Sequence, residues 1–446
     1  MNLSFSKYFA LSLIFLGVTA EAGAQSEEGA ISDVITKGHV DGELRLYNFN
    51  RIYDGKDNRP DQHALSSALL LNGTTGSFHG FSIGASLAGV SDLGSKDDNP
   101  TKVDTTLMGD RSSYAAVTQA YLQYKRDWLT LKGGYQYLNT PWMSGSDIRV
   151  VPASYNAVTA TFTPVKDWNI TLLREFSWRS RTSSSYERDN LYYPAGYEDN
   201  HMFGGNGTLP SNARHDNGTY AAGTTYAIGG LKTQAWLYDF QNFAHLGYID
   251  GSYTFKTGAG FDPVIGAQYA HETGGANNYL TDSTARVNTV VGGDKVKANA
   301  WGLDAGLLIP NGRFDIYYNK LEGSRNAVGG GALVSPFTVG YASDPLYTTS
   351  MIRGLVEMGP GHAWKAKFTY NMLDNKLQFT TAYAKYVTDY FGDSHDVHAD
   401  LTYNFRGVLN GLSIRDRWER SSGGKNGLNP GNQAFTYNRV QVTYKF

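Results

Sequence analysis

The last residues of the chain alternate between apolar and polar side chains, and the alternation runs to a terminal aromatic, Phe446. In an extended strand, neighbouring side chains point to opposite faces. One face then carries Val440, Val442, Tyr444 and Phe446, and the other carries Arg439, Gln441, Thr443 and Lys445. This pattern is typical of the closing strand of a bacterial outer-membrane β-barrel, with its apolar face on lipid and its polar face on the lumen. We therefore expect contact with outer-membrane lipid and lipopolysaccharide, and recognition of the Phe446 strand by the barrel-assembly machinery.

The N-terminal segment fits a secretory signal peptide. Lys7 supplies a positive charge, residues 8–20 are mainly apolar, and Ala22-Gly23-Ala24 fits a small-residue cleavage site. The apolar stretch is too short to span a membrane. The polar residues that follow it at once disfavour a buried N-terminal helix. We predict that residues 1–24 are a signal peptide and that residues 25–446 form a single outer-membrane barrel domain.

The composition is compatible with a barrel and disfavours other classes. Mean hydropathy is −0.39, and no later segment approaches the roughly 20 apolar residues of a membrane helix. A barrel tolerates this value because every second residue can be polar. With 39 Lys and Arg against 41 Asp and Glu, the charge gives no reason to expect a nucleic-acid partner. The absence of cysteine excludes disulfides, thiolate-bound metals and a catalytic thiol.

Short alternating runs separated by turn residues recur along the whole chain. The predicted strands cover 42–52, 81–90, 115–125, 129–137, 158–163, 168–176, 219–228, 232–239, 248–256, 264–271, 300–308, 314–320, 364–371, 377–387, 398–405, 412–420 and the C-terminal 439–446. Short Asn-, Asp- and Gly-rich connections suit periplasmic turns, and long polar ones suit extracellular loops. At about 23 residues for each strand and its connection, the fold class is an all-β transmembrane antiparallel barrel of about 18 strands, with 16 as the alternative.

Several stretches resemble the OprD family of substrate-specific outer-membrane porins. They are 42–51, with Arg45 and Arg51; a series running from Ala120-Tyr-Leu-Gln-Tyr through Asn139-Thr-Pro and Ser146-Asp-Ile-Arg to Pro152; Trp178-Arg-Ser-Arg; and Gly411-Leu-Ser-Ile-Arg-Asp-Arg417. Their order along the chain makes the match specific. The resemblance implies an 18-stranded monomeric barrel narrowed by inward-folded loops, which passes small solutes, often carboxylates, along a ladder of basic side chains. The chain departs from the family pattern at Asp416, where the family has an apolar, outward residue, so this carboxylate marks either a membrane interface or a slip in register.

The candidate pore-lining residues are basic. Arg415 and Arg417 alternate with apolar residues, which places two rigid donors about 7 Å apart on the lumenal face, where they could pass a carboxylate along the wall. The alternative is that each pairs with a wall carboxylate such as Glu419 or Asp389. The remaining candidates are Arg45, Arg51, Lys132, Arg149 and Arg174.

Two loops are candidates for folding into the barrel. The loop around Asp147 and Arg149 is rich in small and apolar residues, which would not remain in water. The alternative role for its charges is pairing of Asp147 with Arg149. The second loop, 341–350, contains Asp344 and Tyr347; the tyrosine could offer a hydroxyl to a solute or simply pack.

These patterns predict a Gram-negative outer-membrane porin for passive, selective diffusion of small-molecule nutrients that carry a carboxylate or are zwitterionic. We expect a monomer or a weak trimer, no cofactor, no metal and no enzymatic activity. The alternatives are a general trimeric porin, an outer-membrane barrel enzyme, and a binding β-sandwich or propeller. His395 and His398 could bind a metal weakly in an acidic turn, but no H-E-x-x-H or G-x-S-x-G motif supports an enzyme.

Overall fold

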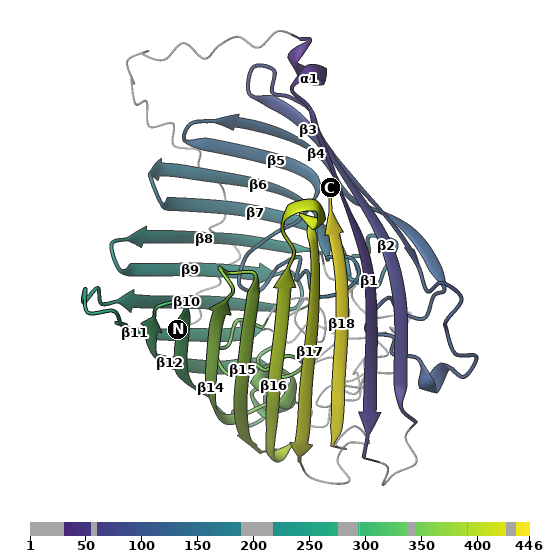
Figure 1. The fold of residues 1–446 in the computed structure, drawn as a ribbon. Coiled ribbons are helices and arrows are strands. Elements are labelled where there is room, and N and C mark those ends of the chain that lie inside the picture. Colours follow the sequence, from purple (N-terminus) through teal and green to yellow (C-terminus); the bar gives the residue numbers. More distant parts are fainter. Residues whose placement is uncertain are drawn as a thin grey trace.

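The described residues form one closed antiparallel sheet. The computed structural model describes residues 31–54, 60–188, 217–274, 293, 295–334, 336, 344–389, 391–424 and 434–446. The predicted signal peptide, residues 1–24, lies outside these ranges. Each strand pairs with its neighbours in the sequence, and β1 pairs with both β2 and β18, so the sheet closes into a barrel of 18 strands (Figure 1). The barrel prediction is confirmed.

The elements run in chain order around the barrel. The strands are β1 (His39–Tyr53), β2 (Gln62–Thr74), β3 (Phe81–Ser91), β4 (Ser113–Arg126), β5 (Leu129–Gln136), β6 (Ser154–Val165), β7 (Trp168–Arg179), β8 (Thr219–Ile228), β9 (Leu231–Phe240), β10 (Ala244–Thr254), β11 (Asp262–Gly274), β12 (Val296–Ile309), β13 (Gly312–Leu321), β14 (Gly361–Met372), β15 (Leu377–Thr388), β16 (Gly392–Asn404), β17 (Leu412–Gly423) and β18 (Phe435–Lys445). The described helices are short: α1 (Asp33–Thr36), α2 (Leu355–Met358) and the 3-10 turns Pro100–Lys102, Val328–Gly330 and Gly407–Leu409. Within the ranges given above, no helix has the length and apolar character needed to cross a membrane.

Strand β2 is the one strand that the sequence pattern missed. The consecutive leucines 69–71 break the expected alternation, because Leu70 is buried under the loops inside the barrel while its two neighbours face outward. The Asn72-Gly73 pair, a sequence typical of a turn, lies within this strand. The chain turns later, at His79 and Gly80, which both have positive φ angles.

The two ends of the barrel differ in their connections. The end that carries α1 and the C-terminus has short connections (Figure 1), and positive φ angles at Asp167, Gly229, Asn311 and Asp374 show why Asp, Asn and Gly occupy its turns. We call it the short-turn end. The opposite, long-loop end carries the connections 92–112, 137–153, 180–218, 275–295 and 322–360, although β9 and β10, like β15 and β16, are joined there by only three residues.

The closing strand has the predicted faces. Arg439 and Gln441 point inward and are buried, whereas Tyr444 and Phe446 are exposed on the outside. The outward face carries exposed apolar side chains on many strands, among them Leu44, Ile83, Leu237, Ile265 and Ile316. This distribution is the one required of a wall that meets hydrocarbon.

Two loops enter the barrel and make its core. Trp142, Met143, Val150 and Val151 of loop 137–153 are completely inaccessible to solvent. In the second loop, α2 is buried along its whole length. A barrel of this size would otherwise enclose open water, so these loops set the width of the passage.

We predict that Gly42→Val weakens closure of the barrel. The Gly42 backbone exchanges two hydrogen bonds with Phe446, of 2.8 and 3.0 Å, and an added Cβ would overlap the Phe446 ring. The exposed Phe446 ring must turn out of its preferred conformation, at a cost of about 0.5–1.5 kcal/mol, so the temperature at which the folded band is lost on a heat-modifiability gel should fall. Gly73→Val is the control, since a Cβ there would have its nearest neighbour at 4.0 Å; equal melting of both variants would contradict the prediction.

Candidate functional site

Arg45 fastens loop 137–153 to the wall of the barrel. Its guanidinium donates to both Asp147 carboxylate oxygens at 2.6 and 2.8 Å and to the Glu43 carboxylate at 2.8 and 3.0 Å. It also donates to the carbonyls of Arg149 and Val150, both at 3.2 Å. Bidentate pairing of this kind is strong and directional. The sequence left open a pairing of Asp147 with Arg149; the structure pairs Asp147 with Arg45 instead.

The same loop contacts the far wall of the barrel. The backbone N–H of Trp142 donates to the Tyr238 hydroxyl on β9 at 3.4 Å, and the indole ring of Trp142 packs edge-on against Tyr248 on β10, 6.1 Å between ring centroids. Strands β9 and β10 lie about halfway around the barrel from β1. The loop therefore crosses the lumen and constricts it, as its composition predicted.

The second loop is held by strands β15 to β17. The backbone N–H of Met351 donates to the Glu419 carboxylate at 2.7 Å, and Arg353 pairs with Asp396 at 2.8 Å. The Tyr386 hydroxyl donates to the Thr348 carbonyl at 2.8 Å. Met351 packs in one apolar cluster with residues of loop 137–153. The described part of this loop, from 344 onward, thus folds inward, as expected.

Four arginines gather where the two loops meet strands β1, β17 and β18. We call Arg51, Arg149, Arg417 and Arg439 the arginine cluster. Arg417 and Arg439 are direct cross-strand partners. The Arg51 and Arg439 guanidiniums both lie over the ring of Tyr437, at 4.4 and 4.1 Å from its centroid. All four side chains are at most 7% exposed, so their charges act on one another with little solvent screening.

One carboxylate, Asp104, faces the cluster from the loop between β3 and β4. Its carboxylate accepts hydrogen bonds from the Tyr437 hydroxyl at 2.5 Å and from the Thr106 hydroxyl at 2.6 Å. Arg149 donates to the Thr106 carbonyl at 2.8 Å. Among the described residues, Asp104 therefore accepts from hydroxyl groups and forms no direct ion pair with a guanidinium. The arginine cluster keeps a net positive charge.

Arg439 is the member of the cluster that stands out. It is completely buried, and none of its three guanidinium nitrogens has a hydrogen-bond partner in the described part of the chain. Its guanidinium is flanked by the rings of Phe49, at 4.8 Å, and Tyr437. Burying a cation whose N–H donors have no acceptor costs free energy, and a bound anion would offset that cost.

Arg415 and Arg417 share a single carboxylate. Arg415 binds Asp400 with bonds of 2.5 to 3.1 Å, and Arg417 donates to the same carboxylate at 3.1 Å. The Nη1 of Arg417 has no partner among the described residues. Both arginines face the lumen as predicted, but their wall partner is Asp400 rather than Glu419 or Asp389. Arg415 is thereby largely neutralised, whereas Arg417 keeps donors for the cluster.

Carboxylates dominate another sector of the wall. Asp250 on β10, Asp304 on β12 and Asp315 on β13 face the lumen, and we call them the acidic sector. Arg313 pairs with Asp304 at 3.1 Å and with Asp315 at 2.7 Å. One oxygen of Asp304 is nevertheless buried without a partner among the described residues. The lumen therefore has a basic side and an acidic side.

The remaining predicted residues fall in three places. Lys132 faces the lumen nearer the short-turn end, with its ammonium 3.7 Å from the centroid of the Tyr121 ring. Tyr347 is half-buried beside Tyr317, 5.6 Å between ring centroids. Arg174 was predicted to line the pore, and this is wrong: it shares the outward face of β7 with Leu172 and Phe176 and donates to the Asn217 carbonyl. The lumenal residue at that level is Glu175.

The geometry rules out the weak metal site that the sequence suggested at His395 and His398. Residues 393–400 were expected to form an acidic turn, but β16 begins at Gly392 and runs through them. His395 faces outward beside Tyr383, and His398 faces inward near Asp400. Side chains three apart in a strand lie on opposite faces, so the two histidines cannot share an ion.

The sequence did not single out Arg439, Arg353 or Asp104. A signal for Arg439 existed, because it lies on the polar face of the closing strand, two residues before Gln441. Its distinctive property, burial without a partner, depends on loops that are distant in the sequence. Arg353 and Asp104 lie in loops, where alternation carries no information.

The fold has close structural counterparts. The BenF-like porin of Pseudomonas fluorescens Pf-5 superposes with a TM-score of 0.72 at 13% identity, over 93% of this chain and 99% of that one. OccK8 (OprE) of Pseudomonas aeruginosa gives 0.70 at 17% identity, with the same two coverages. The chain has the fold of the OprD-type porins. OpdK of Pseudomonas aeruginosa, in a crystal structure with vanillate, gives 0.69 at 14% identity, again over 93% and 99%.

The likeness to these porins is one of fold rather than of sequence. No protein-family model matches the chain, and no curated protein sequence does so. At 13–17% identity, the resemblance lies in the overall fold. The solute of this OprD-type barrel therefore depends on the residues that line its own lumen.

We predict that Arg45→Gln loosens loop 137–153. The change removes the donors to Asp147, Glu43 and two loop carbonyls, a loss of about 1–3 kcal/mol of loop anchoring. Single-channel recordings should show larger and noisier current than the wild type. Lys132→Gln, which removes a lumenal cation without a contact to the loop, should leave the noise unchanged; a quiet Arg45→Gln channel would contradict the prediction.

We also predict that docking of the second loop depends on pH through Asp344. Burial raises the pKa of this carboxyl from 3.8 to about 6, although the Thr349 hydroxyl and the Leu346 N–H donate to it. Because the docked loop holds the proton more tightly than the free loop, docking is favoured at low pH and weakens as pH rises from about 4 to about 6.

The measurement for Asp344 is current noise between pH 4 and 8. Noise should rise over the acidic half of this range and then level off. Asp344→Asn should abolish that rise, whereas Asp374→Asn, in an exposed turn at the short-turn end, should retain it. A wild-type profile that is flat, or that is unchanged by Asp344→Asn, would refute the assignment.

Proposed function

We propose that the protein is an outer-membrane channel for passive diffusion of small, carboxylate-bearing solutes. The observation that supports this most directly is Arg439, a buried lumenal guanidinium whose three nitrogens lack a partner among the described residues. Arg439 has no exposed surface, so an arriving carboxylate must displace the side chains that cover it. It would then accept two of those hydrogen bonds and offset the cost of burying the cation. Localisation in the outer membrane of a Gram-negative bacterium follows from the same barrel class.

The geometry suits movement along the wall rather than tight capture. Neighbouring arginines of the cluster offer successive donors, and Asp400 competes for Arg417 at 3.1 Å. A channel must bind its solute well enough to admit it and weakly enough to release it. The cations also raise the local concentration of anions at the constriction.

A zwitterionic solute is the second candidate. The unpartnered Asp304 oxygen in the acidic sector could accept a bond from an ammonium group while the arginine cluster holds the carboxylate. OpdK, which shares the fold, has been crystallised with vanillate, an aromatic carboxylate. That neighbour favours the simple carboxylate for the first trials.

The competing proposals differ in what they require. A general porin would pass ions without saturation by a carboxylate. A barrel enzyme would need a nucleophile with its base, and the lumenal groups found here are paired or clustered charges. Diffusion down a gradient needs only the charged constriction.

Single-channel recording in a planar bilayer tests the channel proposal. We expect wild-type current to be anion-preferring under a salt gradient and to be reduced by benzoate or a small dicarboxylate. Arg439→Gln should shift the reversal potential towards cations and weaken the carboxylate effect by roughly 10- to 100-fold, the range for a lost charged hydrogen bond.

Arg174→Gln is the matched control, since that arginine lies on the outer wall. It should leave selectivity and carboxylate block unchanged. Absence of conductance from folded, heat-modifiable protein would overturn the channel proposal, and equal behaviour of the two variants would overturn the role of Arg439.

A further inference from the structure

The outward face of β12 to β14 carries a small basic and aromatic group near the long-loop end. Trp301, Lys320 and His362 lie side by side there, in register across the three strands. The Tyr318 ring lies 5.3 Å from the Trp301 ring and 6.2 Å from the His362 ring, between centroids. Within the described ranges the lysine forms no ion pair, so its charge is available to an anion outside the barrel.

The same group is repeated two strands further on. Trp364 on β14, Lys385 on β15 and His395 on β16 are again in register. The Tyr383 ring lies 5.1 Å from the Trp364 ring and 6.0 Å from the His395 ring. Lys385 also has no ion pair in the described part of the chain. We call the two sets the paired donor groups: Trp301, Tyr318, Lys320 and His362, and Trp364, Tyr383, Lys385 and His395.

Both groups lie where the outer wall meets lipid headgroups. Lys320 is next to the end of β13 at Leu321, and Lys385 lies three residues before the end of β15 at Thr388. Tryptophan and tyrosine concentrate at membrane interfaces, and the long loops of outer-membrane barrels are extracellular. The paired donor groups therefore face the headgroups of the outer leaflet.

The side chains of the groups are hydrogen-bond donors. Lysine and tryptophan only donate, and a histidine ring keeps at least one N–H in either protonation state. A phosphate group supplies negative charge and strong acceptor oxygens, which lipid tails lack. Two carboxylates, Glu322 and Asp393, follow towards the loops, two residues from Lys320 and His395. Neither carboxylate pairs with a lysine among the described residues, so both lysines keep their charge.

The two lysines are spaced for one ligand with two charges. Lys385 lies two strands away from Lys320, and its partner Trp364 is two residues further into the membrane than His362, the partner of Lys320. With strands about 4.8 Å apart and residues on one face of a strand about 6.8 Å apart, the two lysine Cα atoms are roughly 12 Å apart.

We propose that the paired donor groups bind the phosphorylated headgroup of lipopolysaccharide. Lipid A, its membrane anchor, is a disaccharide with a phosphate at each end, so one molecule places one phosphate on each group. Hydrogen bonds from an ammonium group to a phosphate are charge-assisted and stronger than neutral ones. The site is separate from the proposed channel activity, because its side chains face away from the lumen.

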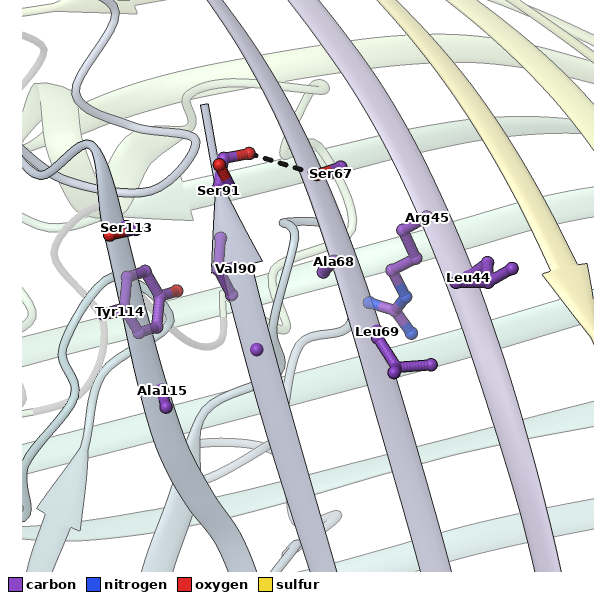
Figure 2. Close-up of a pocket in the computed structure, with 11 residues that line it drawn as sticks. Leu44, Arg45, Ser67, Ala68, Leu69, Val90, Ser91, Ser113, Tyr114 and Ala115 are labelled. Carbon is purple, nitrogen blue, oxygen red and sulfur yellow. Dashed lines mark hydrogen bonds between the residues drawn. The ribbon is translucent and has the colours of Figure 1, made fainter. Parts of the chain in front are cut away.

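The outer wall has another place for a lipid, a hollow of about 600 Å³ on strands β1 to β4 (Figure 2). Leu44 and Leu69 are on its outward lining, and a Cβ placed on Gly89 would meet no atom within 4 Å. Arg45, the charged residue of the lining, is bonded to loop 137–153 inside the barrel. The hollow suits an acyl chain but offers no cation to a phosphate.

Native mass spectrometry of the full protein in mild detergent tests the site, with purified lipid A as the probe. We expect the wild type to bind lipid A with two phosphates more tightly than the form with one phosphate, and more tightly than phosphatidylglycerol. Lys320→Gln or Lys385→Gln alone should bind the two forms of lipid A alike, because only one group remains. The double variant should bind the two-phosphate form roughly 10- to 30-fold more weakly, the loss expected for two cations at a membrane surface.

Two controls separate this site from general attraction and from the hollow. Lys166→Gln with Lys445→Gln removes the same charge from exposed positions at the short-turn end, and Gly89→Leu fills the hollow; both should bind lipid A as the wild type does. Heat-modifiability confirms folding of each variant. Equal binding of lipid A and phosphatidylglycerol by the wild type, equal weakening in the two double variants, or loss of binding in Gly89→Leu alone would overturn the proposal.

Discussion

The structure depends on one constraint: inside a bilayer, every backbone N–H and C=O must be bonded within the protein. A sheet meets this only by closing, and here β1 bonds to both β2 and β18 while the Phe446 backbone completes the ladder at Gly42. Closure imposes period-two alternation on every strand. It also creates an interior that the strands alone cannot fill, so loops must enter it.

The inward loops convert a wide barrel into a charged constriction. They are held by ion pairs from nearby strands of the wall, Asp147 by Arg45 of β1 and Arg353 by Asp396 of β16. Arg45 and Arg439 show how differently two lumenal arginines can be used. Arg45 uses both terminal nitrogens to hold a loop and its Nε to pair with Glu43 on its own strand, whereas the Arg439 donors remain without a partner among the described residues, beside Tyr437. The proposed passage of anions rests on this buried charge, which anchors nothing.

The bilayer also constrains the side chains on the outer wall of the barrel. Where lipid is the neighbour, a wall needs apolar side chains, and Leu44, Ile83 and Ile316 are among those exposed there. Asp416 is an exception: it faces outward between Ile414 and Trp418. Of the two alternatives that the sequence left for Asp416, the structure excludes a slip in register.

Much of the fold was predictable because alternation is a local property. It located all strands except β2, where the leucine run 69–71 hides a residue that packs under a loop. It placed Arg45, Arg51, Arg415 and Arg417 on the lumenal face. Arg174 was assigned to the lumen for its charge, against the alternation, which puts it on one face with Ile170, Leu172 and Phe176. Loop composition predicted the inward fold of 137–153 but not which wall would hold it.

The sequence by itself determined the architecture: an antiparallel barrel with a lipid face, a lumenal face and two ends of different loop length. Only the tertiary structure decided which charges are neutralised. Asp147 meets Arg45 across 102 positions, and Asp400 serves both Arg415 and Arg417. Arg439 is left with none of these carboxylates. Pairing of charges is a matter of distance in space, and alternation along a strand specifies a face but not the partner that faces it.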